Sequence, residues 1–171
     1  MNRLSLAQIN SLSREEFIRL IGPVFEHSPW ITEATWEKRP FANLDQVHFG
    51  LCQTVWNANE AEKIKLIQAH PDLVGRAALS GTLTSESNRE QTSAGLDKLS
   101  PDEIAEFQKL NQNYRDKFNF PFVICARLNK KEAILTGFEK RLQNSREEEI
   151  KTALEEISKI AYLRLQDMVA N

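Results

Sequence analysis

Helix start signals recur along nearly the whole chain, and they constrain its fold more than any other feature. Residues 13–16 (Ser-Arg-Glu-Glu) and 145–148 (Ser-Arg-Glu-Glu) have the spacing of capping boxes, in which serine and glutamate side chains satisfy free backbone N–H groups reciprocally. Residues 100–103 (Ser-Pro-Asp-Glu) add a proline and acidic residues in the first turn, which makes this the strongest start in the sequence. Ser28 before Pro29 is a further signal of this kind. The pattern predicts a chain built from helices.

Apolar residues repeat at helical spacing behind these starts. The clearest stripes are Leu44, Val47, Leu51 and Val55, then Ile104, Phe107, Leu110 and Tyr114, then Ile150, Leu154, Ile157 and Ala161. The chain has only 6 Gly and 6 Pro, and most of them stand where a helix is expected to begin or end. We therefore expect an all-α fold, as a single compact domain that spans residues 1–171.

Composition and charge exclude several classes of protein. The chain is 41% hydrophobic and 27% charged, which is enough apolar material for a core and argues against disorder. With a net charge of -2 and mixed basic and acidic residues, it lacks the basic stripe of a nucleic-acid-binding surface. No stretch approaches the roughly 20 apolar residues of a membrane span. Residues 1–6 lack a signal-peptide core and residues 169–171 lack a Ser-Lys-Leu ending, so we expect a cytoplasmic protein without nucleic-acid or membrane partners.

Two segments depart from the helical pattern. Residues 118–126 (Phe-Asn-Phe-Pro-Phe-Val-Ile-Cys-Ala) form a continuous apolar run with a central proline, which by local rules fits a short buried strand. Because a lone strand has no partner in an otherwise helical chain, an extended segment that lines a core or a pocket is the better interpretation. Residues 75–95 carry glycines and many hydroxyl side chains, and they are expected to form short helical pieces.

Polar residues stand at three places where a plain helical fold does not require them. The first is His70, at the end of a helix that opens near Asn59 and directly before Pro71. One interpretation is a histidine that is favoured by the helix dipole. The other is a general acid or base, because histidine titrates near neutral pH. The local sequence leaves both open.

The second place is the stretch from Ser87 to Gln91. Ser87 and Glu90 have capping-box spacing, so a purely structural role is one interpretation. In a helix, however, Ser87 lies on the same face as Glu90 and Gln91, which follow it by three and four residues. Hydroxyl, carboxylate and amide groups together suit a ligand rich in N–H and C=O groups.

The third place is Arg164, which continues the apolar stripe of the final helix. An arginine on a buried face is costly unless it is paired. An internal salt bridge, for instance to Glu90, is one explanation. A bidentate grip on an anionic ligand is the other, because the guanidinium fork matches a carboxylate.

No metal site or reactive thiol is predicted. His27, His48 and His70 form no His-Glu-x-x-His pattern, and Cys52 and Cys125 form no Cys-x-x-Cys pair. Both cysteines lie among apolar neighbours, so we interpret them as small buried residues rather than as nucleophiles. His48 continues an apolar stripe and is expected in the core, whereas His27 is expected at a surface or an interface.

Several stretches of the chain, in order, carry a resemblance to a known family. They are residues 25–30 (Phe-Glu-His-Ser-Pro-Trp), 39–41 (Arg-Pro-Phe), 69–73 (Ala-His-Pro-Asp-Leu), 83–91, 94–96 (Ala-Gly-Leu), Leu110-Asn111 to Tyr114, 118–124 and Arg164-Leu165. With these stretches the chain resembles, over nearly its whole length, the family of 2-oxo-4-hydroxy-4-carboxy-5-ureidoimidazoline (OHCU) decarboxylases. We see no departure at the positions that matter.

The resemblance implies an all-α fold of the OHCU decarboxylase type, commonly a homodimer. It implies a carboxy-lyase that converts OHCU into (S)-allantoin, the last step from urate, without a metal or an organic cofactor. By the same resemblance, His70, Glu90 and Arg164 are catalytic. The implied substrate-binding residues are Pro71, Ser87, Asn88, Arg89, Glu90, Gln91, Phe122, Val123, Ile124, Cys125 and Ala126.

The implied substrate explains why no cofactor is expected. Its carboxylate sits on a carbon next to a ring C=N, so the electrons that CO2 leaves behind can flow into that imine. The protein need only hold the carboxylate across the ring plane, stabilise developing charge and deliver a proton to one face. Two tasks remain open for His70: removing a hydroxyl proton or protonating the enol that forms.

Two other classes of protein compete with this interpretation. The chain is alternatively a helical module that binds a ureide or a purine without turnover, which a loose site and an internally paired Arg164 would support. A scaffolding helical bundle with no ligand is the third reading, and it leaves the three polar places unexplained.

Overall fold

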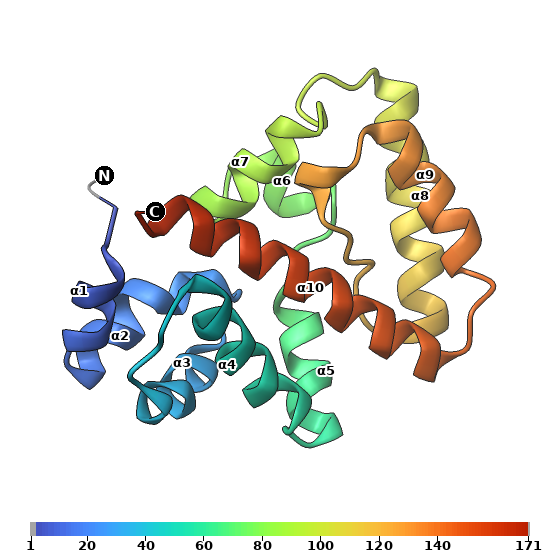
Figure 1. Ribbon diagram of the computed structural model, residues 1–171. Coiled ribbons are helices and arrows are strands. Elements are labelled where there is room, and N and C mark those ends of the chain that lie inside the picture. Colours follow the sequence, from blue (N-terminus) through green and yellow to red (C-terminus); the bar gives the residue numbers. More distant parts are fainter. Residues whose placement is uncertain (1–2, 171) are drawn as a thin grey trace. The chain divides into compact units, whose positions relative to one another are not determined.

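The computed structural model describes residues 3–170. Outside the described residues lie Met1, Asn2 and Asn171. They belong to the two terminal stretches from which a cytoplasmic location was expected. Among residues 3–170 the chain forms no β-strand, and an isolated parallel β-bridge pairs Leu4 with Val169. The all-α expectation is confirmed (Figure 1).

Within residues 3–170, the α-helices are α1 (Leu6–Ser11), α2 (Arg14–Ile21), α3 (Pro29–Thr35), α4 (Leu44–Trp56), α5 (Glu60–Ala69), α6 (Arg76–Ser80), α7 (Ser85–Ser93), α8 (Pro101–Phe118), α9 (Lys131–Arg141) and α10 (Arg146–Met168). Short 3-10 helices are η1 (Gly22–Val24), η2 (Trp36–Lys38) and η3 (Ala126–Leu128). None of the helices in this described range is long and apolar enough to cross a membrane.

The chain divides into two compact units. The first, here called the N-terminal unit, comprises residues 1–69 and 158–171, and the second, the central unit, comprises residues 70–157. The helix α10 contributes its first part to the central unit and its last part to the N-terminal unit. The expectation of one domain over residues 1–171 stays a prediction.

Most of the helix starts follow the expected chemistry. Ser13 and Ser100 head complete capping boxes, and Ser145 exchanges hydrogen bonds with Glu148 at the start of α10. The expected cap at Ser28 is wrong: its hydroxyl donates to the carbonyl of Glu26, so α3 starts without a side-chain cap. A capping box at Ser5 opens α1, a helix that the sequence pattern did not indicate.

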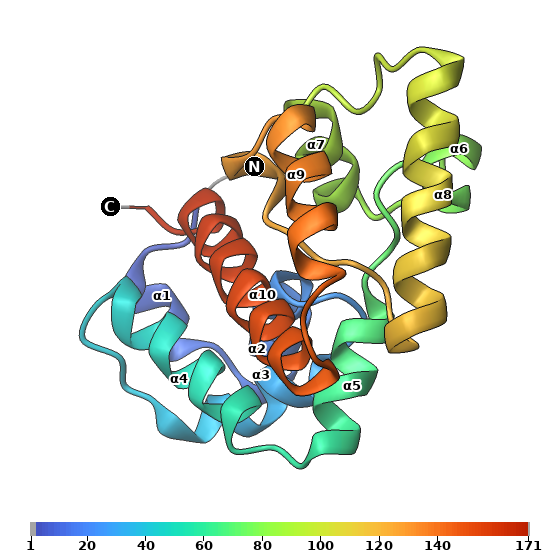
Figure 2. The same ribbon diagram turned by 90° about the vertical axis from the view of Figure 1, so that its right-hand side faces the viewer.

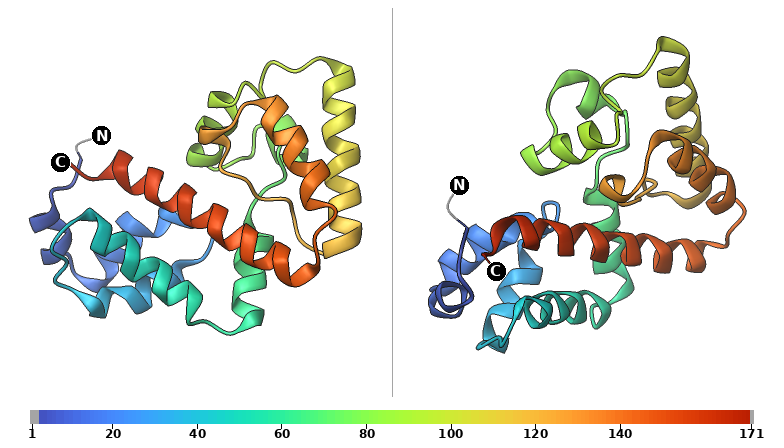
Figure 3. Two further views of the ribbon diagram at one scale, coloured as in Figure 1. Left: turned by 45° about the vertical axis from the view of Figure 1, so that its right-hand side comes forward. Right: turned by 45° about the horizontal axis from the view of Figure 1, so that its top comes forward.

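The N-terminal unit is built on consecutive helix packing. In it α2 packs on α3 and α3 on α4 (Figure 3), so short loops bring neighbouring helices together. Phe17 of α2 stacks on Phe41 at a ring-centroid distance of 6.5 Å. The fully buried apolar side chains of the N-terminal unit include Ile9, Phe17, Ile21, Ile31, Val47 and Leu51.

The central unit has an aromatic core. The helices α8 and α9 lie side by side in it (Figure 2), and residues 120–125 run in extended form between α8 and η3. The buried rings are Phe107, Tyr114, Phe118, Phe120, Phe122 and Phe138. Phe122 stacks on Phe138 with ring centroids 3.8 Å apart. Pro121 keeps this run out of a helix, and burial of its apolar side chains explains why its sequence resembles a buried strand.

Candidate active site

His70 is the first residue of the loop that follows α5. The helix ends at Ala69, as expected from the proline that follows, and the His70 side chain is buried with 6% of its surface exposed. The loop then runs to Gly75 through Val74, which adopts a left-handed backbone conformation with φ of 54°. A β-branched residue rarely takes this conformation, so the loop must be held in place by its surroundings.

Side-chain amides hold this loop. The Gln91 Oε1 accepts the Val74 N–H at 3.0 Å, and the Gln91 Nε2 donates to the Asp72 carbonyl at 3.3 Å. The Asn111 Nδ2 donates to the Leu73 carbonyl at 2.8 Å. The loop backbone thus has its hydrogen bonds supplied by two other helices, α7 and α8, which compensates for the unusual conformation at Val74.

An ion pair adds to this bracing. The Arg115 Nε lies 3.0 Å and 3.1 Å from the two carboxylate oxygens of Asp72. Asn111 and Arg115 were not predicted as supports of the site. The available signal was Asn111 itself, a polar residue among Phe107, Tyr114 and Phe118 on the buried face of α8.

Gly75 leaves no room for a side chain in this loop. A Cβ at this position would lie 2.6 Å from the Asp72 Cβ, too close for two carbon atoms. We expect Gly75→Ala to distort the loop at Asp72 and to lower the free energy of unfolding by about 1–3 kcal/mol. Urea unfolding checks this. Gly137→Ala is the matched control, because its Cβ would be in ordinary contact with Phe122 at 3.4 Å and suits a helix. Equal stability of Gly75→Ala and wild type would contradict the tight fit.

The helix α7 presents one polar face to the interior of the central unit. Ser87, Glu90 and Gln91 are buried on it, as their helical spacing predicts. Asn88 and Arg89 point outward, and the Arg89 side chain is 68% exposed. The structure therefore divides the predicted stretch into an inner and an outer set, and the substrate contacts of both remain predictions.

The segment 122–126, which is extended up to Cys125 and ends at the first residue of η3, completes the cluster. All five of its residues, Phe122, Val123, Ile124, Cys125 and Ala126, are buried, and α7 packs against η3, which begins at Ala126. The Asn129 Nδ2 donates to the Cys125 carbonyl at 2.9 Å and fixes the end of the segment. The loop at His70, the inner face of α7 and this segment are thus brought together within the central unit, with α7 touching both of the others.

The environment of Cys125 suits a thiol and not a thiolate. Burial, and then the nearby carboxylates of Glu156 and Glu90, raise the pKa of the Cys125 thiol above its usual value. We expect iodoacetamide to alkylate Cys125 at least about tenfold more slowly than a free cysteine at pH 8.5, with a pH midpoint above that of the free thiol. Mass spectrometry of the alkylated peptide checks this, and a midpoint at or below the free-thiol value would contradict it.

Arg164 lies on the part of α10 that belongs to the N-terminal unit. Its side chain is buried, and its guanidinium is 2.9 Å from the Glu26 carboxylate and 3.1 Å from the Pro23 carbonyl. Of the two explanations that the sequence left open for this arginine, the structure contains an internal salt bridge, and its acidic partner Glu26 was not indicated by the sequence. Glu26 stands inside the stretch 25–30 that carried part of the resemblance, which was the available signal.

The remaining histidines and Cys52 lie in the N-terminal unit. The His48 ring is half-buried. Its Nε2 lies 2.8 Å from the Ser158 carbonyl oxygen and 3.3 Å from the Cys52 Sγ. Cys52 is half-buried, in contrast to the expected full burial, because it borders a cavity of about 620 Å³. His27 is exposed, as expected for a surface residue. Across residues 3–170, no group of three or more His, Cys, Asp or Glu side chains is arranged to hold a metal ion.

Comparisons with known proteins agree with the resemblance. A sequence model of the family described as OHCU decarboxylase matches residues 10–166. The chain is 42% identical over 166 residues to a 2-oxo-4-hydroxy-4-carboxy-5-ureidoimidazoline decarboxylase from Amia calva, covering 97% of this chain and 95% of that protein. It is 39% identical over 168 residues to a protein of the same name from Halalkalicoccus jeotgali, and this match covers 98% of this chain and 93% of that protein.

A solved structure shares the fold. The crystal structure of an (S)-allantoin synthase superposes with a TM-score of 0.79 at 26% sequence identity. The match covers 98% of this chain but 54% of that one, so the chain spans about half the length of the solved protein.

Proposed function

The chain belongs to the OHCU decarboxylase family, and from this premise we propose that it removes CO2 from OHCU to give (S)-allantoin, the last step from urate to allantoin. A reaction that breaks a carbon–carbon bond in this way makes it a carboxy-lyase. The observation that carries the proposal is the meeting of the His70 loop, the inner face of α7 and the segment 122–126 in the central unit.

The reaction needs placement and proton transfer more than a reactive group. The bond between the ring carbon and the carboxylate breaks, CO2 departs, and the electron pair moves into the neighbouring C=N, whose nitrogen takes up a proton. The resulting enol collapses to a carbonyl when a proton reaches the adjacent carbon, and the face of that protonation sets the (S) configuration. Decarboxylation consumes one proton overall, so the protein must hold a proton donor on one side of a fixed ring.

His70 is proposed as the group that transfers this proton. It is buried, and the loop that it opens is fixed by Gln91, Asn111 and the Arg115–Asp72 ion pair. Such bracing keeps an imidazole in one place relative to a bound ring, which raises the effectiveness of general acid–base catalysis. Pro71 directly after it removes one backbone donor and stiffens the chain reversal.

Ser87 and Glu90 are proposed to bind the ureido group and the ring amides. A carboxylate accepts N–H donors, and a hydroxyl both accepts and donates, so the pair matches the alternating N–H and C=O groups of the substrate. Gln91 is proposed to act mainly through the loop, because both ends of its amide are hydrogen-bonded to the backbone of Asp72 and Val74. Peptide groups of the segment 122–126 are proposed to meet the remaining polar edges of the ring.

Arg164 is proposed as a catalytic residue that supplies positive charge. Glu26 serves as its buried counter-ion, and the Pro23 carbonyl fixes a second point of the guanidinium. A guanidinium held at two points has a defined orientation, and its planar fork matches the geometry of a carboxylate ligand.

Release of CO2 tests the proposal. Urate labelled with ¹³C at the carbon that becomes the carboxylate is converted into OHCU by urate oxidase and hydroxyisourate hydrolase, and labelled CO2 is followed by mass spectrometry. We expect this protein to speed up the release by orders of magnitude over the spontaneous reaction. Release at the spontaneous rate, together with tight binding of (S)-allantoin, would replace the proposal by the ureide-binding module.

A homodimer and a cytoplasmic location are the remaining parts of the proposal, and both rest on the resemblance. Sedimentation velocity of the full chain tests the first: we expect a single species of twice the chain mass of 19.6 kDa. A species of 19.6 kDa at micromolar concentration would contradict it.

A further inference from the structure

Arg141, at the end of α9, contacts the extended segment 122–126 in two ways. Its Nη1 donates to the Val123 carbonyl at 2.6 Å, and its guanidinium carbon lies 4.3 Å from the centre of the Phe122 ring. The hydrogen bond fixes the backbone of the segment at one peptide group, and the stacked guanidinium fixes the neighbouring side chain. The side chain of Arg141 therefore acts on two consecutive residues of the segment that the proposed function assigns to substrate.

Glu149, in the first turn of α10, balances the charge of Arg141. The Arg141 Nε donates to the Glu149 Oε1 at 2.8 Å, and the Asn144 Nδ2 donates to the Glu149 Oε2 at 2.9 Å. The Tyr114 hydroxyl donates to the Oε1 as well. Glu149 is fully buried, so both of its oxygens obtain their partners from the protein.

Stability alone does not account for this arrangement. An apolar pair of similar volume would avoid the desolvation of two buried charges, and such replacements are often neutral or stabilising. Among residues 3–170, the buried Arg141 Nη2 has no hydrogen-bond partner, which adds a further cost. What the guanidinium provides, and an apolar side chain would not, is a directed contact with one carbonyl and one ring of the segment.

We infer that Arg141 is a positioning residue that sets the conformation of the segment 122–126 for substrate binding, with Glu149 as the counter-ion that anchors it. The inference rests on the proposed function, since it assigns this segment to the substrate pocket. Arg141 itself does not touch the substrate in this account. It acts through Val123 and Phe122.

Arg141→Lys is the direct test. Lysine keeps the charge beside Glu149 but loses the fork that reaches the Val123 carbonyl and the flat group that covers Phe122. We expect KM for OHCU, and the Kd of (S)-allantoin measured by calorimetry, to rise about tenfold, which is the scale of one lost hydrogen bond to a charged group. The kcat is expected to stay within about twofold, because the segment binds the ground state and the transition state alike.

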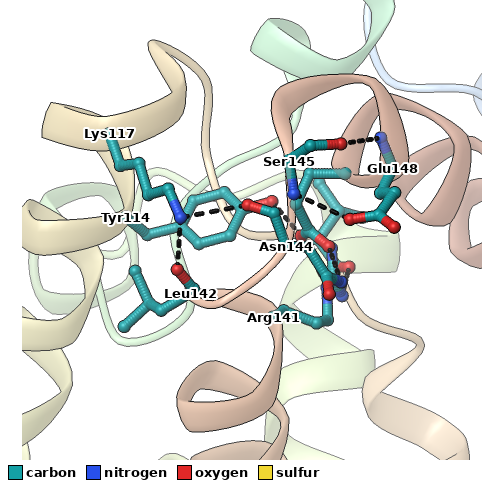
Figure 4. Close-up of polar contacts among 9 residues, drawn as sticks. Tyr114, Lys117, Arg141, Leu142, Asn144, Ser145 and Glu148 are labelled. Carbon is teal, nitrogen blue, oxygen red and sulfur yellow. Dashed lines mark hydrogen bonds and ion pairs between the residues drawn. The ribbon is translucent and has the colours of Figure 1, made fainter.

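Lys117→Met is the matched control. Lys117 donates to the carbonyls of Leu142 and Asn144, at 2.5 Å and 3.0 Å, so it ties the same corner of the central unit without touching the segment (Figure 4). We expect it to lower the melting temperature while KM and Kd stay at wild-type values. Folded Arg141→Lys protein with unchanged KM and Kd would overturn the inference. So would an equal rise of KM in Lys117→Met, because that would trace the effect to general loosening.

A second variant covers the case in which Arg141→Lys does not fold. The double variant Arg141→Met with Glu149→Gln removes both charges together and keeps an acceptor for the Tyr114 hydroxyl, so a stable protein is expected. The same tenfold rise in KM and Kd is expected from it, and wild-type values would overturn the inference. Failure of the proposed function is distinguishable, because then wild type itself would release CO2 at the spontaneous rate.

Discussion

The variant His70→Ala is expected to lose turnover while the fold remains. Removing the only proposed proton-transfer group should lower kcat for OHCU by about 10³-fold, within the range that general acid–base catalysis contributes. Labelled CO2 release measures the rate, and far-ultraviolet circular dichroism with thermal unfolding shows whether the helices persist. The side chain lies in a loop whose backbone is held by Gln91 and Asn111, so the loop is expected to keep its place without it.

The control for this variant is His27→Asn. His27 is 72% exposed and its backbone φ is 43°, a conformation that asparagine tolerates, so this change is expected to leave both the fold and kcat unchanged. If His70→Ala retained wild-type turnover, the assignment of His70 would be wrong. If both variants lost activity equally, the loss could not be attributed to removal of the His70 side chain.

The variant Glu149→Met is expected to have the largest effect on stability. It removes the counter-ion of the buried Arg141 and leaves the Tyr114 hydroxyl and the Asn144 amide without their acceptor. Breaking one side of a buried ion pair costs about 3–5 kcal/mol of unfolding free energy. Urea unfolding with linear extrapolation is the measurement.

Two further variants show whether the loss has this cause. Glu147→Gln changes an exposed glutamate on the same turn of α10, and its unfolding free energy is expected within about 0.5 kcal/mol of wild type. The double variant Arg141→Met with Glu149→Gln is expected to recover most of the loss, since no unpaired charge remains. A Glu149→Met protein as stable as wild type would show that the Arg141–Glu149 pair does not stabilise the fold.

The helices were largely predictable because their signals are local. Capping boxes, proline at the first turn and apolar stripes of period 3.6 depend on residues within one or two turns of each other, and at Ser13, Ser100 and Ser145 the structure has the expected hydrogen bonds. Ser28 does not cap α3: its backbone ψ of 62° departs from the extended conformation of the caps Ser13 and Ser100, and its hydroxyl is turned toward the Glu26 carbonyl, to which it donates. The extended segment was predicted from its proline and from the absence of a pairing partner.

The supports of the candidate site were harder to predict because they join residues that are distant in the sequence. Asn111 and the loop residue Leu73 are 38 positions apart, and Arg115 and Asp72 are 43 positions apart. No local pattern links such pairs. The pairing of Arg164 illustrates the same limit: the sequence left an internal salt bridge and an anionic ligand open, and Glu26 is 138 positions away, so only the fold identifies it as a partner.

The buried Arg141–Glu149 pair was also absent from the sequence interpretation. Arg141 follows an apolar stripe at the basic end of a helix, where a solvated cation beside the helix dipole is the usual expectation. Glu149 likewise stands among acidic residues of a first turn. Each residue has an ordinary local explanation, and only the fold of the central unit reveals that the two residues contact each other and that Arg141 also contacts the segment 122–126.

The configuration of the product tests the central claim most directly. In water the enol intermediate is protonated from both faces, so spontaneous decay of OHCU gives racemic allantoin and no lasting circular dichroism. A site that holds the ring and protonates one face should instead leave a stable (S)-allantoin signal that grows in proportion to the enzyme added. Circular dichroism of OHCU generated from urate, with and without this protein, is therefore the measurement. A lasting (S) signal is the predicted result, and a product that stays racemic in the presence of the protein would contradict the account.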